Sequence, residues 1–318
     1  MPFSLLLGVA FVLDLVLGDP RWLPHPVRAI GWLARVCEGL WRRLVSGQRL
    51  AGVMTVLSVL TGVGGVVLVL IEIGQWIHPL AGDAVRLYFM YASFAARDLA
   101  CHSQQVHAAL ADGDLPLARQ RVAMIVGRET VSLDEVGVSR ACVESVAENI
   151  VDGVTAPLLW AAVAGPVGAM AYKAVNTMDS MFGYKNERYC QFGWAPARLD
   201  DLANFLPARL TALMVVFASA FLGYAPRLSY HIWRRDRRNH SSPNSAHTEA
   251  AVAGALGIQL GGPSVYFGAV VDKPTIGDPH TPLTARHIVA VNRLMLATAV
   301  ITVLLVVLAH GSFWVAMG

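Results

Sequence analysis

The sequence predicts an all-α, polytopic integral membrane protein, in which a helical bundle carries polar cytoplasmic helices and loops. Two observations predict this class. Of the 318 residues, 55% are hydrophobic and only 15% are charged, and the mean hydropathy of +0.50 is far above that of ordinary soluble domains. Uncharged stretches that approach the roughly 20 residues needed to cross a bilayer as a helix also recur along the chain. Because no repeat or low-complexity tract divides it, we treat 1–318 as one domain.

Apolar segments predict the membrane helices in order. They are residues 3–17, 51–71, 154–172, 210–225 and 294–318. At least two of the three longer ones should span, whereas 3–17 and 210–225 need bilayer thinning or protein neighbours to cross fully. The segment 154–172 contains Pro157 and Gly165-Pro166, so we expect a broken helix that either spans or is re-entrant.

Polar segments set the expected orientation. Arginines cluster in residues 21–49 and 227–238, and the positive-inside rule places both segments in the cytoplasm. Residues 86–153 alternate apolar and polar positions at helical spacing, which predicts a cytoplasmic helical pair. The four cysteines stand singly, so neither a zinc site nor a disulfide framework is indicated. The net charge of +3 and the scattered arginines do not form the basic face of a nucleic-acid-binding protein.

The first cluster of candidate functional residues is a helical stripe. Arg140, Glu144, Glu148 and Asp152 follow one another at i, i+4 spacing. Three carboxylates on one stripe favour a cation such as magnesium, which takes oxygen ligands and bridges to substrate phosphates. The alternative is a solvated face with an Arg140–Glu144 ion pair.

Two further clusters combine carboxylates with basic and amide groups. Lys173, Asn176 and Asp179 recur every third residue, and Gly183 should end their helix before Lys185–Arg188. Arg198, Asp200, Asp201, Asn204 and Arg209 precede the apolar segment 210–225. Such groups suit a phosphate and metal site, since Lys and Arg hold phosphate oxygens. A juxtamembrane anchor and helix-terminal charges are the respective alternatives. Residues 236–250 read as a loop that leads into a Gly-rich stretch.

Five motifs together resemble one known family. They are GDPRWLPHPVRAIG (18–31), SVAENIVDGVTAPLLW (145–160), NTMDSMFGYKNERY (176–189), FGWAPARLDDLANFLPARLTA (192–212) and HSSPNSAHTEAAVAGALGIQLGG (240–262). In order and spacing they resemble the adenosylcobinamide-phosphate synthases of cobalamin biosynthesis, the CobD/CbiB type. The resemblance covers nearly the whole chain.

The resemblance implies an amide-forming ligase of the cell inner membrane. It would join adenosylcobyric acid to (R)-1-amino-2-propanol or its O-phosphate, driven by ATP with Mg²⁺. On this reading, the hypothetical magnesium ligands are Glu144, Glu148, Asp152 and Asp179. Phosphate or substrate would be held by Lys173, Lys185, Arg188, Arg198, Arg209 and Asn176. Asp201 or His240 would act as the base that deprotonates the amine. A homo-oligomer, or association with other membrane enzymes of the pathway, is also expected.

Two other functional classes remain open at this point. A transporter would explain Asp14, which lies inside an apolar segment, and the broken helix at 154–172. A prenyl or alcohol phosphotransferase would use Asp200, Asp201 and Asn204 as a diphosphate–metal site. The second aspartate-rich motif that such enzymes commonly use is not evident.

Overall fold

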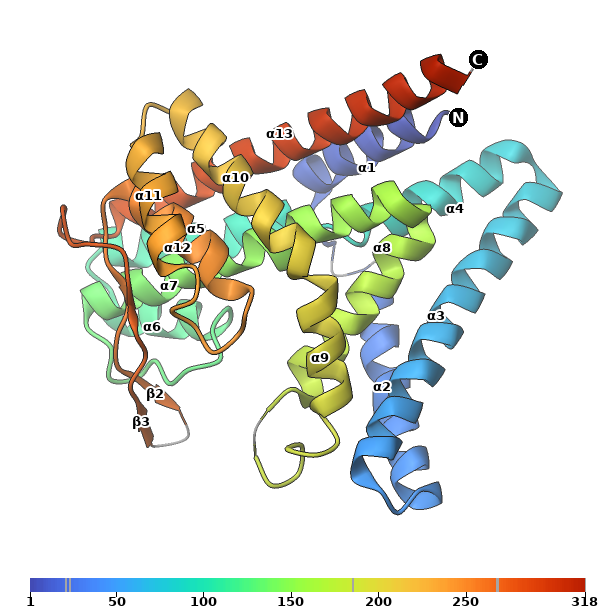
Figure 1. Ribbon diagram of the computed structural model, residues 1–318, viewed down its shortest axis with the longest axis horizontal. Helices are drawn as coiled ribbons and strands as arrows, with labels where there is room; N and C mark the ends of the chain where they lie inside the picture. Colours follow the sequence, from blue (N-terminus) through green and yellow to red (C-terminus); the bar gives the residue numbers. More distant parts are fainter. Residues whose placement is uncertain (21, 23, 185, 267–268, 318) are drawn as a thin grey trace. The chain divides into compact units, whose positions relative to one another are not determined.

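The protein is described by a computed structural model that covers residues 1–20, 22, 24–184, 186–266 and 269–317. The all-α membrane fold is confirmed, because helices dominate these residues and strands are few and short (Figure 1). The chain divides by its internal contacts into two compact units. Unit 1 comprises Met1–Ala95, Ala156–Asn204 and the chain from Val303 on, and unit 2 comprises Ala96–Thr155 and Phe205–Thr302. Both units are therefore assembled from segments that lie far apart in the sequence.

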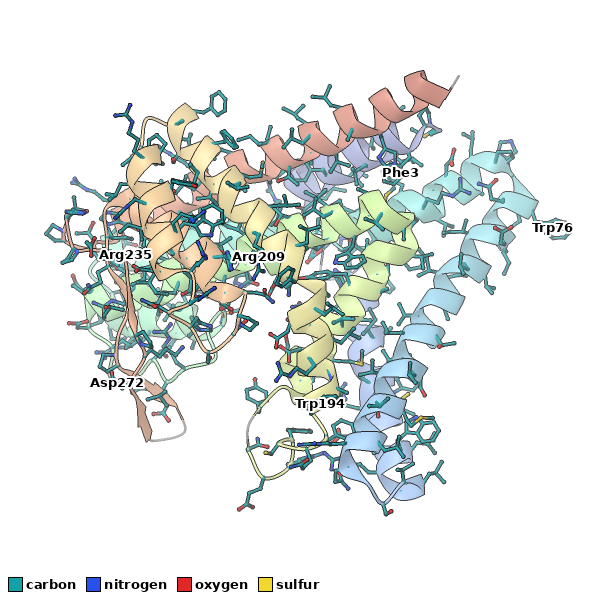
Figure 2. All side chains as sticks on the ribbon, in the orientation of Figure 1. Phe3, Trp76, Trp194, Arg209, Arg235 and Asp272 are labelled. Atoms are coloured by element: carbon teal, nitrogen blue, oxygen red, sulfur yellow. The ribbon has the colours of Figure 1, made fainter. Side chains whose placement is uncertain are left out.

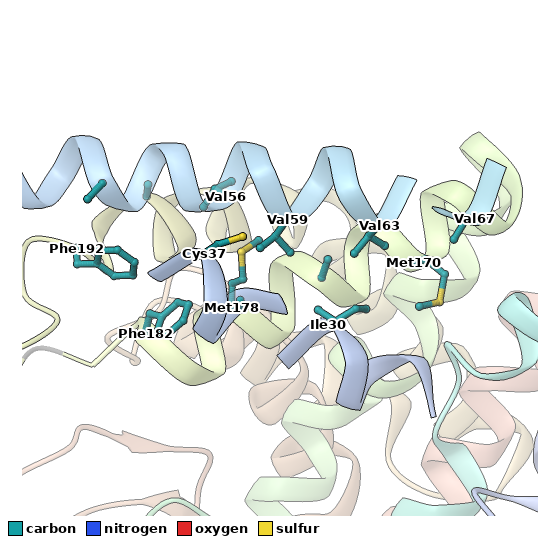
Figure 3. Close-up of a cluster of buried hydrophobic side chains, with 14 of the residues drawn as sticks. Ile30, Cys37, Val56, Val59, Val63, Val67, Met170, Met178, Phe182 and Phe192 are labelled. Atoms are coloured by element: carbon teal, nitrogen blue, oxygen red, sulfur yellow. The ribbon is translucent and has the colours of Figure 1, made fainter. Parts of the chain in front are cut away.

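Unit 1 is built around a buried apolar core (Figure 3). Its helices are α1 (Phe3–Leu17), α2 (Pro26–Leu44), α3 (Gln48–Ile77), α4 (Pro79–Tyr91), α8 (Ala156–Phe182), α9 (Trp194–Ala203) and the C-terminal part of α13 (Arg286–Met317). Val56, Val59, Val63 and Val67 recur every three or four residues, so they form one stripe of α3. This stripe packs in the cluster that also contains Ile30 of α2 and residues of α8. The opposite side of α3 stays apolar and exposed, as expected of a helix that faces lipid.

Three helices are long and apolar enough to cross a membrane. They are Gln48–Ile77, Glu135–Phe182 and Arg286–His310, and a fourth span results if α9 and α10 (Phe205–Phe221), which are bent by 44°, count as one. All five predicted apolar segments lie at least largely within helices. Trp76 projects from the end of α3 with 89% of its surface exposed, a position typical of an interfacial aromatic residue (Figure 2).

The predicted break in the third apolar segment is confirmed. Ala164 and Gly165 leave helical geometry, and Gly165 adopts φ +60°, which an L-residue with a side chain rarely takes. Pro166 follows and cannot donate to the helix. Pro157, by contrast, is accommodated, because the preceding turn Ile150–Thr155 (η1) is a wider π-helix.

Gly52 permits a close approach that no larger residue allows. A Cβ at this position of α3 would lie 2.1 Å from the backbone oxygen of Phe192, whereas a Cβ at Gly65 of the same helix would meet nothing within 4 Å. We therefore expect Gly52→Ala to reduce the free energy of unfolding by about 1–3 kcal/mol through overpacking. Gly65→Ala, the matched control, should be neutral or stabilising by up to about 1 kcal/mol. Denaturant titration in detergent micelles measures both, and equal effects would contradict the packing argument.

Unit 2 surrounds a helix that is buried on nearly every side. Its elements are α5 (Ala96–Ala111), α6 (Leu115–Ala123), α7 (Glu135–Asn149), η1, α10, α11 (Pro226–Asp236), α12 (Ser245–Leu256), β1 (Leu260–Gly261), β2 (Ser264–Tyr266), β3 (Ala269–Val271), β4 (Thr275–Ile276) and the N-terminal part of α13. Residues 246–254 of α12 are all buried, and the small side chains let α11 approach closely. A Cβ at Gly254 would lie 2.6 Å from the backbone oxygen of Leu228 in α11.

Two predictions about unit 2 were wrong. The polar region 86–153 holds α5, α6 and α7 after the end of α4, rather than a helical pair, because Gly113 at φ +73° turns the chain after α5. The loop predicted over 236–250 ends at Asn244, since the small residues that follow form the buried start of α12. Two antiparallel two-stranded sheets, β1–β4 and β2–β3, were not predicted.

Candidate functional site

Unit 2 contains a polar cavity of about 240 Å³, which we call the glutamate cavity. Its wall combines α7, α12, the loop before α7, the loop before α12 and the strand region around β4. Its ionisable groups are Arg128, Glu144, Glu148, His240, Glu249, Asp272 and Lys273. Asp272 lies next to the β2–β3 hairpin (Figure 2). Lysine, arginine and several carboxylates in one small cavity suit a small charged ligand.

The strand side of the cavity is fixed by an ion-pair network. The Arg235 guanidinium contacts both Asp236, through Nε at 2.7 Å, and Asp278, through Nη1 at 2.8 Å. The backbone N–H of Gly277 donates to the buried Asp236 carboxylate at 2.8 Å. The segment that carries β4 is thereby held on the end of α11, which places Lys273 and Ile276 at the cavity.

Glu144 is held by two donors. Arg128 forms a buried ion pair with its Oε2, and the backbone N–H of Gly261 donates to its Oε1 at 2.6 Å. Gly261 adopts φ +76°, and a Cβ there would lie 2.3 Å from the backbone oxygen of Pro274. Glycine is required at this position, because only it lets the N–H reach Glu144 from so tight a turn.

Glu148 lies one helical turn further along α7. Its Oε1 accepts a hydrogen bond from Ser245 Oγ at 2.8 Å, which ties α7 to the start of α12. Beside it, Asn149 donates through Nδ2 to the backbone oxygen of Ser145. The sequence prediction that Glu144 and Glu148 share one face is confirmed, since both line the cavity.

Glu249 is the functional candidate that the sequence reasoning missed. It lies in the middle of α12, only 6% exposed, and lines the cavity with its carboxyl group. Burial raises its pKa well above the usual range, and the nearby Glu148 and Glu144 charges raise it further. The sequence signal was a glutamate within the run AHTEAAVAGA, whose small residues indicate a buried helix. Glutamate is rarely buried in such a helix unless it has a partner or a function.

His240, which the sequence offered as a possible base, also lines the cavity. Burial lowers its pKa, and Lys273 lowers it further, although Glu148 opposes the shift. The backbone N–H of Ser242 donates to His240 Nδ1 at 3.0 Å. In the neutral ring that bond places the proton on Nε2, so His240 presents a hydrogen-bond donor to the cavity rather than a free lone pair.

The four predicted magnesium ligands differ in their surroundings, and their metal role stays a prediction. Asp152 lies in the π-helical turn, where α-helical spacing no longer applies, and it is not among the cavity residues. Both oxygens of Glu144 already accept hydrogen bonds, and Asp179 belongs to unit 1. Among the described residues, no group of three His, Cys, Asp or Glu side chains is arranged to hold a metal ion. The residues of the cavity therefore do not fit a resident magnesium ion.

Unit 1 gathers a second group of predicted residues along α8 and α9. Asp200 receives a hydrogen bond from Asn204 Nδ2 at 3.0 Å, and Asn204 Oδ1 accepts from the Tyr172 hydroxyl at 2.8 Å. The Asn176 amide forms a hydrogen bond with the Asp200 side chain, and the Asp179 carboxylate lies close enough to interact with it electrostatically. Lys173 lies on α8, one turn before Asn176. The predicted C-terminal break at Gly183 is confirmed, because α8 ends at Phe182.

The remaining predicted phosphate ligands have protein partners or lie elsewhere. Arg188 pairs with Glu38 at 3.2 Å, and the largely exposed Arg198 pairs with Asp201 at 3.8 Å. Arg209 of unit 2 donates to Asn244 Oδ1 at 3.3 Å and to the backbone oxygen of Phe205. Lys185 lies outside the described residues. The phosphate roles of these side chains stay predictions.

The class that this fold and site define is an all-α membrane protein with a small cavity lined by charged groups. Residues 7–295 match the family described as CobD/Cbib protein. The cobalamin biosynthesis protein CobD of Geobacter metallireducens is 52% identical over 296 residues, covering 93% of each chain. The CobD protein of Leptospira interrogans (strain Fiocruz L1-130) is 44% identical, and the match covers 98% of each chain. The CobD protein of Clostridium perfringens is 46% identical, and the match covers 90% of this chain and 91% of the relative. No solved structure matches.

The chain belongs to the CobD/CbiB family. It is therefore a protein of cobalamin biosynthesis. The family resemblance read from the five sequence motifs is confirmed.

Proposed function

We propose that the protein joins a small amine to a corrinoid carboxylate in an ATP-dependent reaction at the cell inner membrane. The substrates are adenosylcobyric acid and (R)-1-amino-2-propanol or its O-phosphate, and the product is adenosylcobinamide or its phosphate. The observation that carries the proposal is the glutamate cavity, which combines acceptors and donors for a small charged substrate in a protein of cobalamin biosynthesis. Three to four apolar helices would make the enzyme multi-pass.

The proposed reaction has two steps that balance. The γ-phosphoryl group of ATP moves to the propionate carboxylate, and ADP leaves. The amine nitrogen, after losing a proton to a base, attacks the acyl carbon; the C–N bond forms, and the C–O bond to phosphate breaks as phosphate departs. ATP would arrive with Mg²⁺ as a metal–nucleotide substrate, because the cavity offers no preformed metal cage. Mg²⁺ neutralises phosphate charge, which is the usual requirement of phosphoryl transfer.

Mass spectrometry of the purified protein given adenosylcobyric acid, each amine, ATP and Mg²⁺ tests the proposal. We expect amide product only when ATP is present. If Glu148 and Asp179 contact the Mg²⁺ that arrives with ATP, Glu148→Gln and Asp179→Asn should each lower the rate by about 100-fold or more, the usual cost of losing electrostatic stabilisation of the transition state. Glu135→Gln is the matched control, since Glu135 is exposed at the start of α7. No amide from any combination would exclude the ligase, and near-normal rates in both variants would remove their assigned roles.

A further inference from the structure

Glu249 occupies a position that calls for a ligand. Its side chain is more than nine-tenths buried, lies at the cavity, and accepts no hydrogen bond from any residue that the structure describes. Buried polar groups nearly always have partners, and an uncompensated carboxylate carries the largest desolvation cost. The carboxyl group of Glu249 therefore needs a donor or a cation that enters the cavity from outside.

The charges around Glu249 favour a cation as that ligand. Glu148 and Glu144 both add negative potential at Glu249, and the effect of each is larger than the opposing effect of Lys273 or of Arg128. Arg128 is committed to Glu144 by their buried ion pair. A metal ion is disfavoured, because the described carboxylates and histidines form no group of three with metal-holding geometry. A primary ammonium ion needs only acceptors within hydrogen-bond reach, and the oxygens of Glu249 and Glu148 supply them.

The cavity also carries donors for a second, electronegative group on the same ligand. Lys273 lines it, and the Nε2–H of neutral His240 is a further donor. A volume of about 240 Å³ is below the usual range for drug-sized ligands, so a corrin macrocycle does not fit and a molecule of a few heavy atoms does. A short chain with an ammonium group at one end and a hydroxyl or phosphate at the other matches this set.

We propose that the glutamate cavity binds a short amino alcohol or its phosphate ester. The ammonium group donates to Glu249, and the hydroxyl or phosphate group accepts from Lys273 and His240. This inference rests on the proposed function, in which such a compound is the amine substrate. It assigns that substrate to unit 2 and leaves the corrinoid and ATP outside this cavity.

Calorimetry of the purified full-length protein in detergent tests the assignment without turnover. (R)-1-amino-2-propanol and its O-phosphate are compared with propane-1,2-diol, in which a hydroxyl replaces the amine. We expect whichever of the two amines binds more tightly to have a Kd at least about tenfold lower than that of the diol. This is the usual contribution of one charge-assisted hydrogen bond to the affinity. Tighter binding of the O-phosphate than of the free amine would support a phosphate at the end of the cavity that Lys273 and His240 line. Equal binding of amines and diol overturns the proposal.

Glu249→Gln is the decisive variant, because it keeps the shape and cannot form the carboxylate that would pair with an ammonium ion. We expect amine binding to weaken at least about tenfold and the KM for the amine to rise by a similar factor. The KM for ATP should not change, whereas a general loss of folding would alter both. Glu135→Gln, on the exposed face of α7, serves as control and should bind the amine as the wild type does.

The outcomes separate this proposal from the proposed function. If the wild type binds the amine but forms no amide, the ligase fails and the binding site stands. If amide forms and Glu249→Gln binds the amine normally, the site assignment fails and the ligase stands. If Glu249→Gln loses Mg²⁺ binding while amine binding persists, the cavity is a metal site and the proposal is overturned. Should Glu249→Gln not fold, the wild-type comparison of amine and diol decides alone.

Discussion

Arg128→Ala should reduce the free energy of unfolding by about 3–5 kcal/mol, the usual cost of removing one partner of a buried ion pair. Arg128 and Glu144 keep only 12% and 8% of their side-chain surface exposed, so Glu144 would be left charged in a poorly solvated site. The N–H of Gly261 would be its remaining donor among the hydrogen bonds described above. Denaturant titration of the purified protein in detergent micelles measures the loss.

Two comparisons give this prediction its controls. Arg198→Ala removes the exposed partner of Asp201 and should cost at most about 1 kcal/mol, as surface ion pairs do. The double variant Arg128→Met with Glu144→Met removes both charges together and should recover most of the lost stability. A loss below about 1 kcal/mol for Arg128→Ala would show that water reaches Glu144.

His247 should make the protein less stable as the pH falls from about 6.5 toward 4. The ring is 4% exposed, and Trp233 Nε1 donates to its Nδ1 at 2.9 Å. Burial lowers its pKa to about 4, with the Arg209 and Arg237 charges adding to the effect. An unfolded histidine binds a proton below about pH 6.5 while the folded one does not, so the free energy of unfolding falls by about 3 kcal/mol across this window.

His247→Gln should remove that part of the pH dependence. His231→Gln is the control, because His231 is exposed on α11. The stability of this variant should fall with decreasing pH as much as that of the wild type. Unfolding titrations between about pH 4 and pH 7 provide the comparison. Identical slopes for the wild type and His247→Gln would mean that the His247 ring has the same pKa in the folded and the unfolded protein.

The apolar helices could be predicted from the sequence because lipid and the core impose the same composition over long stretches. The segment 3–17 matches α1 residue for residue, and the break at Gly165 followed from glycine next to proline. α2 was not predicted. Its many arginines suggested a loop, although its apolar positions, including Ile30, Ala34 and Cys37, form one buried stripe.

The site was predictable only where its residues lie on one helix. Glu144 and Glu148 share a face of α7 because their spacing is helical, and the sequence shows that spacing directly. Gly261, Lys273 and Glu249 join them through contacts across more than 100 residues of chain, which periodicity does not encode. The π-helical turn moves Asp152 away from the stripe of Glu144 and Glu148. The residue spacing does not indicate this change of helical pitch, so the sequence could not predict it.

The Glu144–Gly261 hydrogen bond has a consequence for biosynthesis. Its two residues are 117 positions apart, whereas Arg128 precedes Glu144 by only 16. At translation rates of about 5–20 residues per second, Gly261 is synthesised roughly 6–23 s after Glu144. Of these two partners of Glu144, Arg128 is therefore the only one that has been synthesised during that interval.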